Sequence, residues 1–107
     1  MFAKFFDTSA IDVFAAKVTA ELLKSHPPQK LDDKSRQAEK RREQLDQRIR
    51  LAVQKLADAS PLNVYQKAKL GTKLQETLQG AGYPEEFSAS MARDVVKLVA
   101  FRSSSSR

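Results

Sequence analysis

Apolar side chains recur with helical spacing over four stretches of the chain. The first stretch covers about residues 9–25. It has the i, i+3, i+4, i+7 spacing of an amphipathic helix at Ile11, Phe14, Ala15, Val18 and Leu22. Pro27 and Pro28 follow directly, and a residue that precedes proline is pushed out of the α region. The pattern therefore predicts a helix that ends near Ser25.

Three further helices are predicted, over about residues 31–59, 62–79 and 84–101. Ser60-Pro61 separates the second from the third, and Gly80-Ala81-Gly82 supplies a turn after the third. Because the connections are short, we expect consecutive helices to pack as neighbours. The sequence thus predicts an all-α fold: a small antiparallel bundle of four helices with the second extended. We expect a single domain over residues 1–102 and a disordered polar tail over 103–107.

The long second helix suggests a way in which the chain could associate with itself. In a heptad frame its g positions are basic, at Lys34, Arg41, Arg48 and Lys55, whereas three of its four e positions are acidic, at Asp32, Glu39 and Asp46. A parallel dimer pairs g of one chain with e of the other. The seam would then use Lys34, Glu39, Arg41, Leu45, Asp46, Arg48 and Ile49. For this helix we favour a simpler interpretation, in which residues 45–56 pack into the chain's own bundle and residues 32–44 form a solvated face.

Charge adds a second alternative. The 107 residues hold 19 Lys and Arg against 13 Asp and Glu, a formal net charge of +6 that is spread along the chain. Dispersed positive charge gives weak affinity for polyanions without naming one. Weak, sequence-nonspecific nucleic-acid binding would use Arg36, Lys40 and Arg42 of the long helix and Lys69 and Lys73 of the third. A parallel homodimer or a protein partner is favoured over it, because the cations of the long helix scatter around its circumference.

The N-terminal aromatics Phe2, Phe5 and Phe6 form an apolar patch. We expect it to dock on the bundle or on a partner, since a short aromatic anchor without a long basic face binds lipid weakly. No run of eighteen apolar residues is present, so no transmembrane segment is predicted. Asp7 interrupts what would be the apolar region of a signal peptide. Together with the absence of Cys, this predicts a cytoplasmic protein.

Candidate chemistry is sparse. The sequence has no Cys and one His, His26, so no thiolate or multi-histidine metal site is expected, and no cofactor is predicted. Adjacent carboxylates such as Asp32-Asp33 point about 100° apart on a helix and do not make an acid/base pair. Lys67 and Asp94 are predicted to meet across the third and fourth helices. The sequence therefore predicts no enzyme, but a non-catalytic protein–protein interaction or self-association module.

Overall fold

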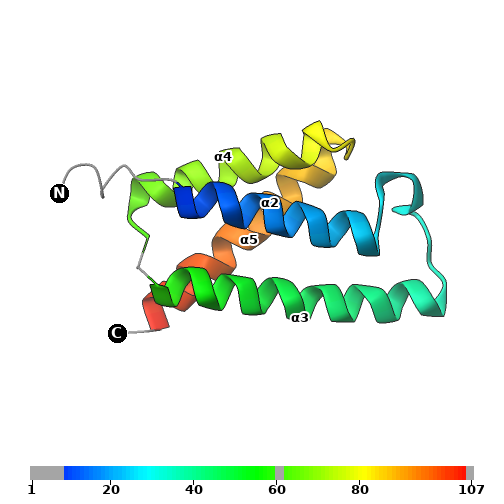
Figure 1. Ribbon diagram of the computed structural model, residues 1–107, viewed down its shortest axis with the longest axis horizontal. Coiled ribbons are helices and arrows are strands. Elements are labelled where there is room, and N and C mark those ends of the chain that lie inside the picture. The colour runs from blue at the N-terminus through cyan, green and yellow to red at the C-terminus, as the bar shows by residue number, and fades with distance from the viewer. Residues whose placement is uncertain (1–8, 60–61, 106–107) are drawn as a thin grey trace.

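The chain folds into a bundle of four α-helices (Figure 1). The computed structural model describes residues 9–59 and 62–105, with the side chains of 103–105 excepted. Its elements are α2 (Ser9–Ser25), the 3-10 turn η1 (Pro28–Lys30), α3 (Arg36–Ala59), α4 (Val64–Gly80) and α5 (Glu85–Ser105). None of the residues described forms a strand, and the predicted all-α bundle is confirmed.

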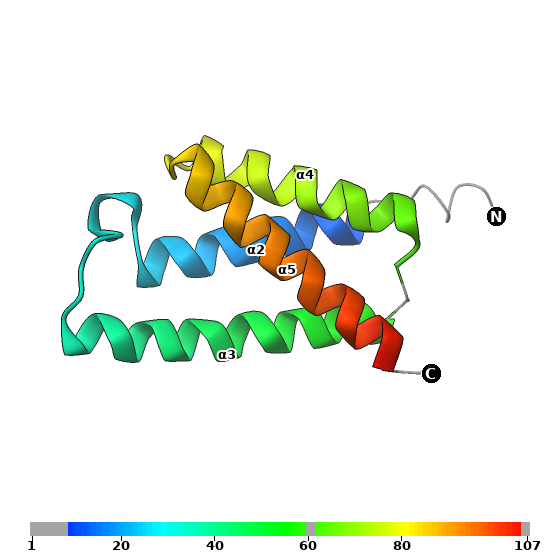
Figure 2. The same ribbon diagram turned by 180° about the vertical axis from the view of Figure 1, so that it is seen from behind.

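The helices form a ring in which α2 contacts α3 and α4, and α5 contacts α4 and α3. The helices α2 and α4 run in one direction and α3 and α5 in the other (Figures 1 and 2). Consecutive helices are neighbours for α2–α3 and for α4–α5, as expected. In contrast, α3 and α4 lie diagonally in the ring.

The core is built from one apolar row of each helix. In α4 the buried row is Leu70, Leu74 and Leu78, and α2, α3 and α5 supply much of the rest of the core at Ile11, Val18, Leu22, Leu45, Ile49, Val53, Val95 and Val99. Gly71 of α4 faces Val96 of α5, where an added Cβ would lie 3.4 Å from Val96 Cγ2. An added Cβ would thus be in van der Waals contact with α5.

The start of the long helix was predicted wrongly. It begins at Arg36 rather than at Leu31. The side chain of Asp33 accepts the Ser35 N–H at 2.9 Å, and Ser35 Oγ accepts the Ala38 N–H at 3.1 Å. Such side-chain acceptors compete with helical hydrogen bonds and favour a helix start. Ser35 therefore caps α3, and residues 31–34 form the connection from η1.

Local interactions also determine where α4 begins and ends and how far α5 extends. Asn63 and Gln66 form a reciprocal capping box at the start of α4. Its end is a Schellman turn: Gly82 has φ of +105°, and the Tyr83 N–H reaches Leu78 O at 3.1 Å. The backbone of α5 stays helical through residues 103–105, assigned above to a disordered tail, because no Pro or Gly interrupts it there. Residues 106–107 lie outside the described part.

His26 joins three parts of the bundle. Its ring is 4% exposed, and Nε2 lies 3.2 Å from Ala38 O of α3. The Tyr83 hydroxyl donates to His26 O at 2.8 Å, and the Tyr83 ring stacks on Phe87 at 5.3 Å. The last turn of α2 is thereby fixed to α3 and to the α4–α5 turn. The single histidine is a structural residue at this end of the bundle.

Candidate functional site

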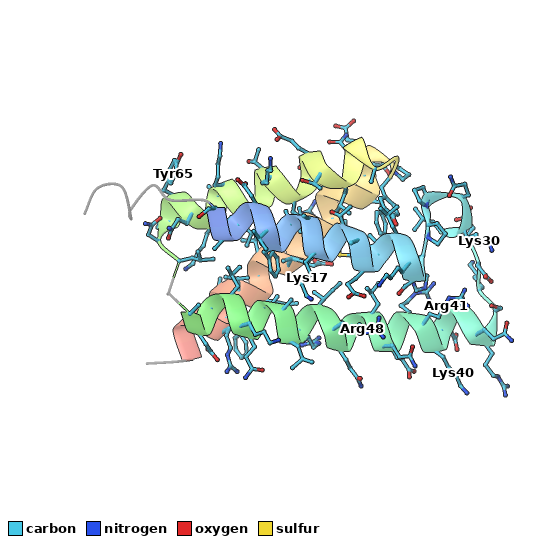
Figure 3. The ribbon with its side chains drawn as sticks, in the orientation of Figure 1. Lys17, Lys30, Lys40, Arg41, Arg48 and Tyr65 are labelled. Atoms are coloured by element: carbon cyan, nitrogen blue, oxygen red, sulfur yellow. The ribbon has the colours of Figure 1, made fainter. Side chains whose placement is uncertain are left out.

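The two sides of α3 differ in the charged residues that they carry. The basic column of the heptad frame faces α2, where Arg41 Nε donates to Ser25 O at 3.1 Å and Arg48 donates to Glu21 at 3.0 Å. Figure 3 shows Arg41 and Arg48 between α2 and α3. Arg41 also lies 3.6 Å from Asp33. The C-terminal carbonyl of a helix is the negative end of its dipole, so this column complements the end of α2 within the same chain.

The residues predicted for self-association are therefore dispersed. Leu45 and Ile49 are 5% and 7% exposed and belong to the core, while Arg41 and Arg48 contact α2. Lys34 precedes the helix and has no heptad position. Glu39 and Asp46 stay exposed on the other side of α3. A parallel coiled coil through this seam would require the bundle to open.

The residues predicted to contact polyanions do not come together either. Arg36, Lys40 and Arg42 lie on α3 and Lys69 and Lys73 on α4, and these two helices are diagonal in the ring. Lys40 points away from the bundle (Figure 3). Phe2, Phe5 and Phe6 lie outside the described residues.

The predicted ion pair between Lys67 and Asp94 was wrong. None of the ion pairs in the described part of the chain joins them. Lys67 lines a hollow between α4 and α5 together with Arg93 and Lys97. Asp94 is rotated about 100° from Arg93 around the helix and so leaves this hollow.

An apolar cavity opens where α3 and α5 diverge. The two helices are close at their C-terminal ends and separate toward their N-terminal ends (Figures 1 and 2). The cavity has a volume of about 180 Å³ and is lined by Leu22, His26, Leu31, Arg42, Leu45, Phe87 and Met91. All but two of these side chains are apolar. The space could therefore accept an apolar group of modest size.

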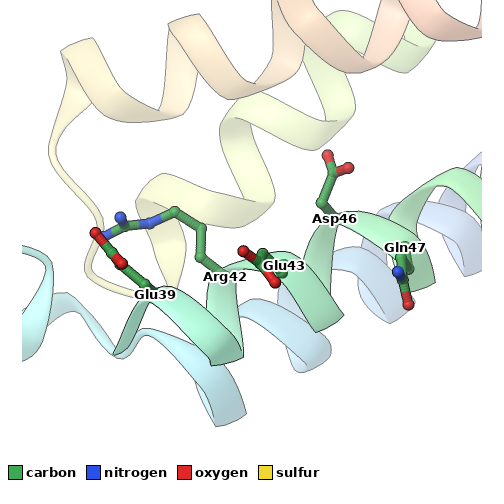
Figure 4. A pocket seen from close by; sticks show the side chains of 5 residues that line it. All are labelled: Glu39, Arg42, Glu43, Asp46 and Gln47. Atoms are coloured by element: carbon green, nitrogen blue, oxygen red, sulfur yellow. The ribbon is translucent and has the colours of Figure 1, made fainter. Parts of the chain in front are cut away.

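An open hollow with an acidic wall adjoins this cavity. Its volume is about 650 Å³, and its lining residues all belong to α3: Glu39, Arg42, Glu43, Asp46 and Gln47. In Figure 4, Arg42 and Asp46 rise from α3 toward the side of α5, and Glu43 projects between them. Asp46 pairs with Arg50 at 2.8 Å, whereas Glu39 and Glu43 are exposed. Since Arg42 lines both spaces, we treat the residues that line them as one surface, the α3/α5 surface.

Among the described residues, two ionisable groups have shifted pKa values, and both are in structural contacts. The backbone N–H and the hydroxyl of Ser35 lower the pKa of Asp33, with a further contribution from Arg41. Burial raises the pKa of Tyr83 to about 12. Both groups fix the connections at the His26 end of the bundle. The buried Nδ1 of His26, on the edge of the apolar cavity, accepts no hydrogen bond from the residues described.

Neither a metal site nor a membrane-spanning helix is found in the described ranges. No three side chains of His, Cys, Asp or Glu are grouped there as metal ligands. No helix among residues 9–59 and 62–105 is long and apolar enough to cross a bilayer. Comparisons with protein-family models, with curated proteins and with solved structures find no match to this chain.

Sequence reasoning missed the part of the α3/α5 surface that α5 supplies. Phe87 and Met91 of α5 are only partly buried and line the cavity. Their spacing identifies one face of a helix without showing how far that face is covered. The oblique course of α5 decides this.

Proposed function

We propose that this chain is a non-catalytic module that binds a partner protein through the α3/α5 surface. The observation that carries the proposal is the apolar cavity beside exposed carboxylates, at the end of the bundle where α3 and α5 diverge. Protein interfaces commonly combine an apolar centre with a polar rim. The polar side chains at this surface are held on regular helices, so the shape exists before a partner arrives.

The proposal also includes an alternative function and a cellular location, which rest on fewer observations. Weak, nonspecific nucleic-acid binding is the alternative function, and its support is the net charge of +6. It ranks second because Arg41 and Arg48 are engaged with α2, and because the other candidate cations lie on diagonal helices. We also propose a cytoplasmic location, on the ground that the sequence holds no Cys.

A selection experiment tests the proposed function. A library of displayed peptides is enriched on the immobilised chain, and the enriched clones are then bound to Met91→Glu and to Val64→Glu. Met91 lines the cavity, whereas Val64 is 82% exposed at the start of α4. We expect the enriched peptides to bind the wild type and Val64→Glu equally well and to lose their binding to Met91→Glu.

Two outcomes would overturn the proposal: no peptide is enriched, or the enriched peptides bind Met91→Glu as well as the wild type. Circular dichroism establishes first that both variants fold. If Met91→Glu does not, Glu43→Lys replaces it, since Glu43 is exposed and lies on the same surface.

A further inference from the structure

We infer that the segment bound at the α3/α5 surface is an amphipathic helix that presents one large apolar side chain flanked by Lys or Arg. This inference rests on the proposed function and names the class of partner. Three features of the surface lead to it: the size of the cavity, the lack of backbone partners in its walls, and the charge of its rim.

The size of the cavity fits a single side chain. Its volume is about 180 Å³, and an apolar cavity of about 150 Å³ accommodates benzene. Leu31, Leu45, Phe87 and Met91 supply most of its wall, so a polar group would lose its hydration there without replacement. The best occupant is therefore the side chain of one Phe or Leu.

The walls favour a helix over an extended strand. A strand needs backbone N–H and C=O groups on a neighbouring edge, because its own are not satisfied internally. Most of the surface is supplied by α3 and α5, whose backbone groups are engaged in their own helices, while the end of α2 and the connection at Leu31 contribute side chains to the cavity. A helix satisfies its own backbone and can lie between two diverging helices with its apolar row inward. The wall from Glu39 to Gln47 rises about 12 Å, a little more than two turns of helix.

The rim determines the charge of the partner. Glu39 and Glu43 of α3 are exposed, and neither side chain has a partner within the described part of the chain. On α5, Asp94 is exposed and follows Met91 by three residues, which places it on the same face of the helix. Arg42 is the cation on the wall of α3. The carboxylates outnumber it, so Lys or Arg at either side of the anchor would gain attraction and a polyanion would be repelled.

Three synthetic peptides of equal length test the inference. The first is an alanine-based helix with one Phe and with Lys one turn before and one turn after it. The second replaces every Lys by Glu, and the third replaces the Phe by Ala. Binding to the full chain is measured by fluorescence anisotropy at low and at high salt. We expect the first peptide to bind at least about tenfold more tightly than either of the others, and less tightly at high salt.

A matched pair of variants locates the contact. Glu43→Lys and Glu76→Lys make the same charge change at exposed positions, on α3 at the rim and on α4 away from it. We expect Glu43→Lys to weaken binding of the first peptide about tenfold, because an attraction is replaced by a repulsion. Glu76→Lys should leave the affinity of this peptide unchanged.

The failures of the inference and of the proposed function are distinguishable. If the acidic peptide binds as tightly as the basic one, or if both variants act alike, the basic partner is wrong while a peptide-binding surface stands. If no peptide binds and sedimentation equilibrium shows a dimer that Met91→Glu abolishes, the surface serves a second copy, and the inference is overturned. If none of the three peptides binds and the chain stays monomeric, the inference is overturned, and the proposed function falls with it only if the displayed library also yields no binder.

Discussion

The side of α3 that faces α2 and the side that faces α5 differ in whether their charged side chains have partners within the chain. Toward α2, Arg41 and Arg48 are bound to Ser25 O and to Glu21 of the same chain. Toward α5, Glu39 remains in solvent on the open hollow that adjoins the apolar cavity, and Glu43 lines the same hollow on the exposed face of α3. The difference follows from the path of the two neighbours, since α2 runs alongside α3 in the opposite direction whereas α5 crosses α3 obliquely (Figures 1 and 2). One side of the helix thus serves the fold, and the other is available to a partner.

The largest effect on stability is expected at Leu45, which lies beneath both sides of α3. Leu45 is 5% exposed and belongs both to the core and to the cavity wall. Leu45→Ala should lower the free energy of unfolding by about 2–5 kcal/mol, because it removes buried methyl groups and leaves a void. Urea denaturation measures this. Leu51→Ala, at a leucine 57% exposed on the same helix, is the control and should change stability by less than about 0.5 kcal/mol. Equal losses would contradict the placement of Leu45.

A smaller effect is expected at the end of the bundle that holds both sides together. Tyr83→Phe removes the hydrogen bond to His26 O and should cost about 0.5–1.5 kcal/mol near neutral pH. Burial raises the pKa of Tyr83 from 10.0 to about 12. With the folded pKa above the unfolded one, the contribution is complete below pH 10 and is lost as pH rises toward 12.

In that alkaline range, ionisation of Tyr83 in the unfolded chain should lower the stability of the wild type by up to about 1.4 kcal/mol per pH unit. Tyr83→Phe lacks this dependence, so the advantage of the wild type should shrink above pH 10. Denaturation curves of both proteins at several alkaline pH values check this. A constant difference between them would contradict the burial of the hydroxyl.

Charge reversal should separate the two sides of α3 directly. Arg48→Glu places like charges together beside Glu21 and should reduce stability by up to about 1 kcal/mol, since the pair is partly exposed. Glu43→Lys, on the side of α5, should change stability by less than about 0.5 kcal/mol. Thermal denaturation at low salt compares the two. The reverse order would mean that the α5 side contributes more to the fold than its contacts indicate.

The smallest effect is expected at the start of α3. Ser35 lowers the pKa of Asp33 below 3.8, so the stabilising contribution of this carboxylate is present above that pH and is lost as pH falls through the folded value. The difference in stability between the wild type and Asp33→Ala should therefore narrow under acid conditions. Carbon-detected NMR titration of the Asp33 carboxyl gives the pKa itself. An ordinary value would show that the Ser35 contacts do not persist in solution.

Much of the fold could be predicted from the sequence, because the signals are local. Apolar spacing identified the four helices, and Pro28, Asn63 and Gly82 mark the connections in ways that backbone chemistry explains. The start of α3 was misplaced because heptad spacing continues to Leu31, whereas the side chains of Asp33 and Ser35 satisfy the backbone differently.

The candidate site was harder to predict, because spacing does not identify the neighbour that a helix face meets. Basic and acidic residues do occupy separate columns on the long helix, but Arg41 and Arg48 of the basic column contact α2 of the same chain. The cavity depends on the crossing of α5 over α3. That crossing is a property of packing, including the contact of Gly71 with Val96, which no single stretch of sequence contains.

The contact between Tyr83 and His26 has a consequence for the rate at which the bundle opens. It joins residues 57 positions apart, one in each helical hairpin, and so it can form only after the two hairpins have docked. An interaction made late in folding acts mainly on the unfolding rate. We expect Tyr83→Phe to speed unfolding in stopped-flow experiments while leaving the folding rate nearly unchanged. The Tyr83 hydroxyl would then set how long the His26 end of the bundle stays folded before the protein unfolds.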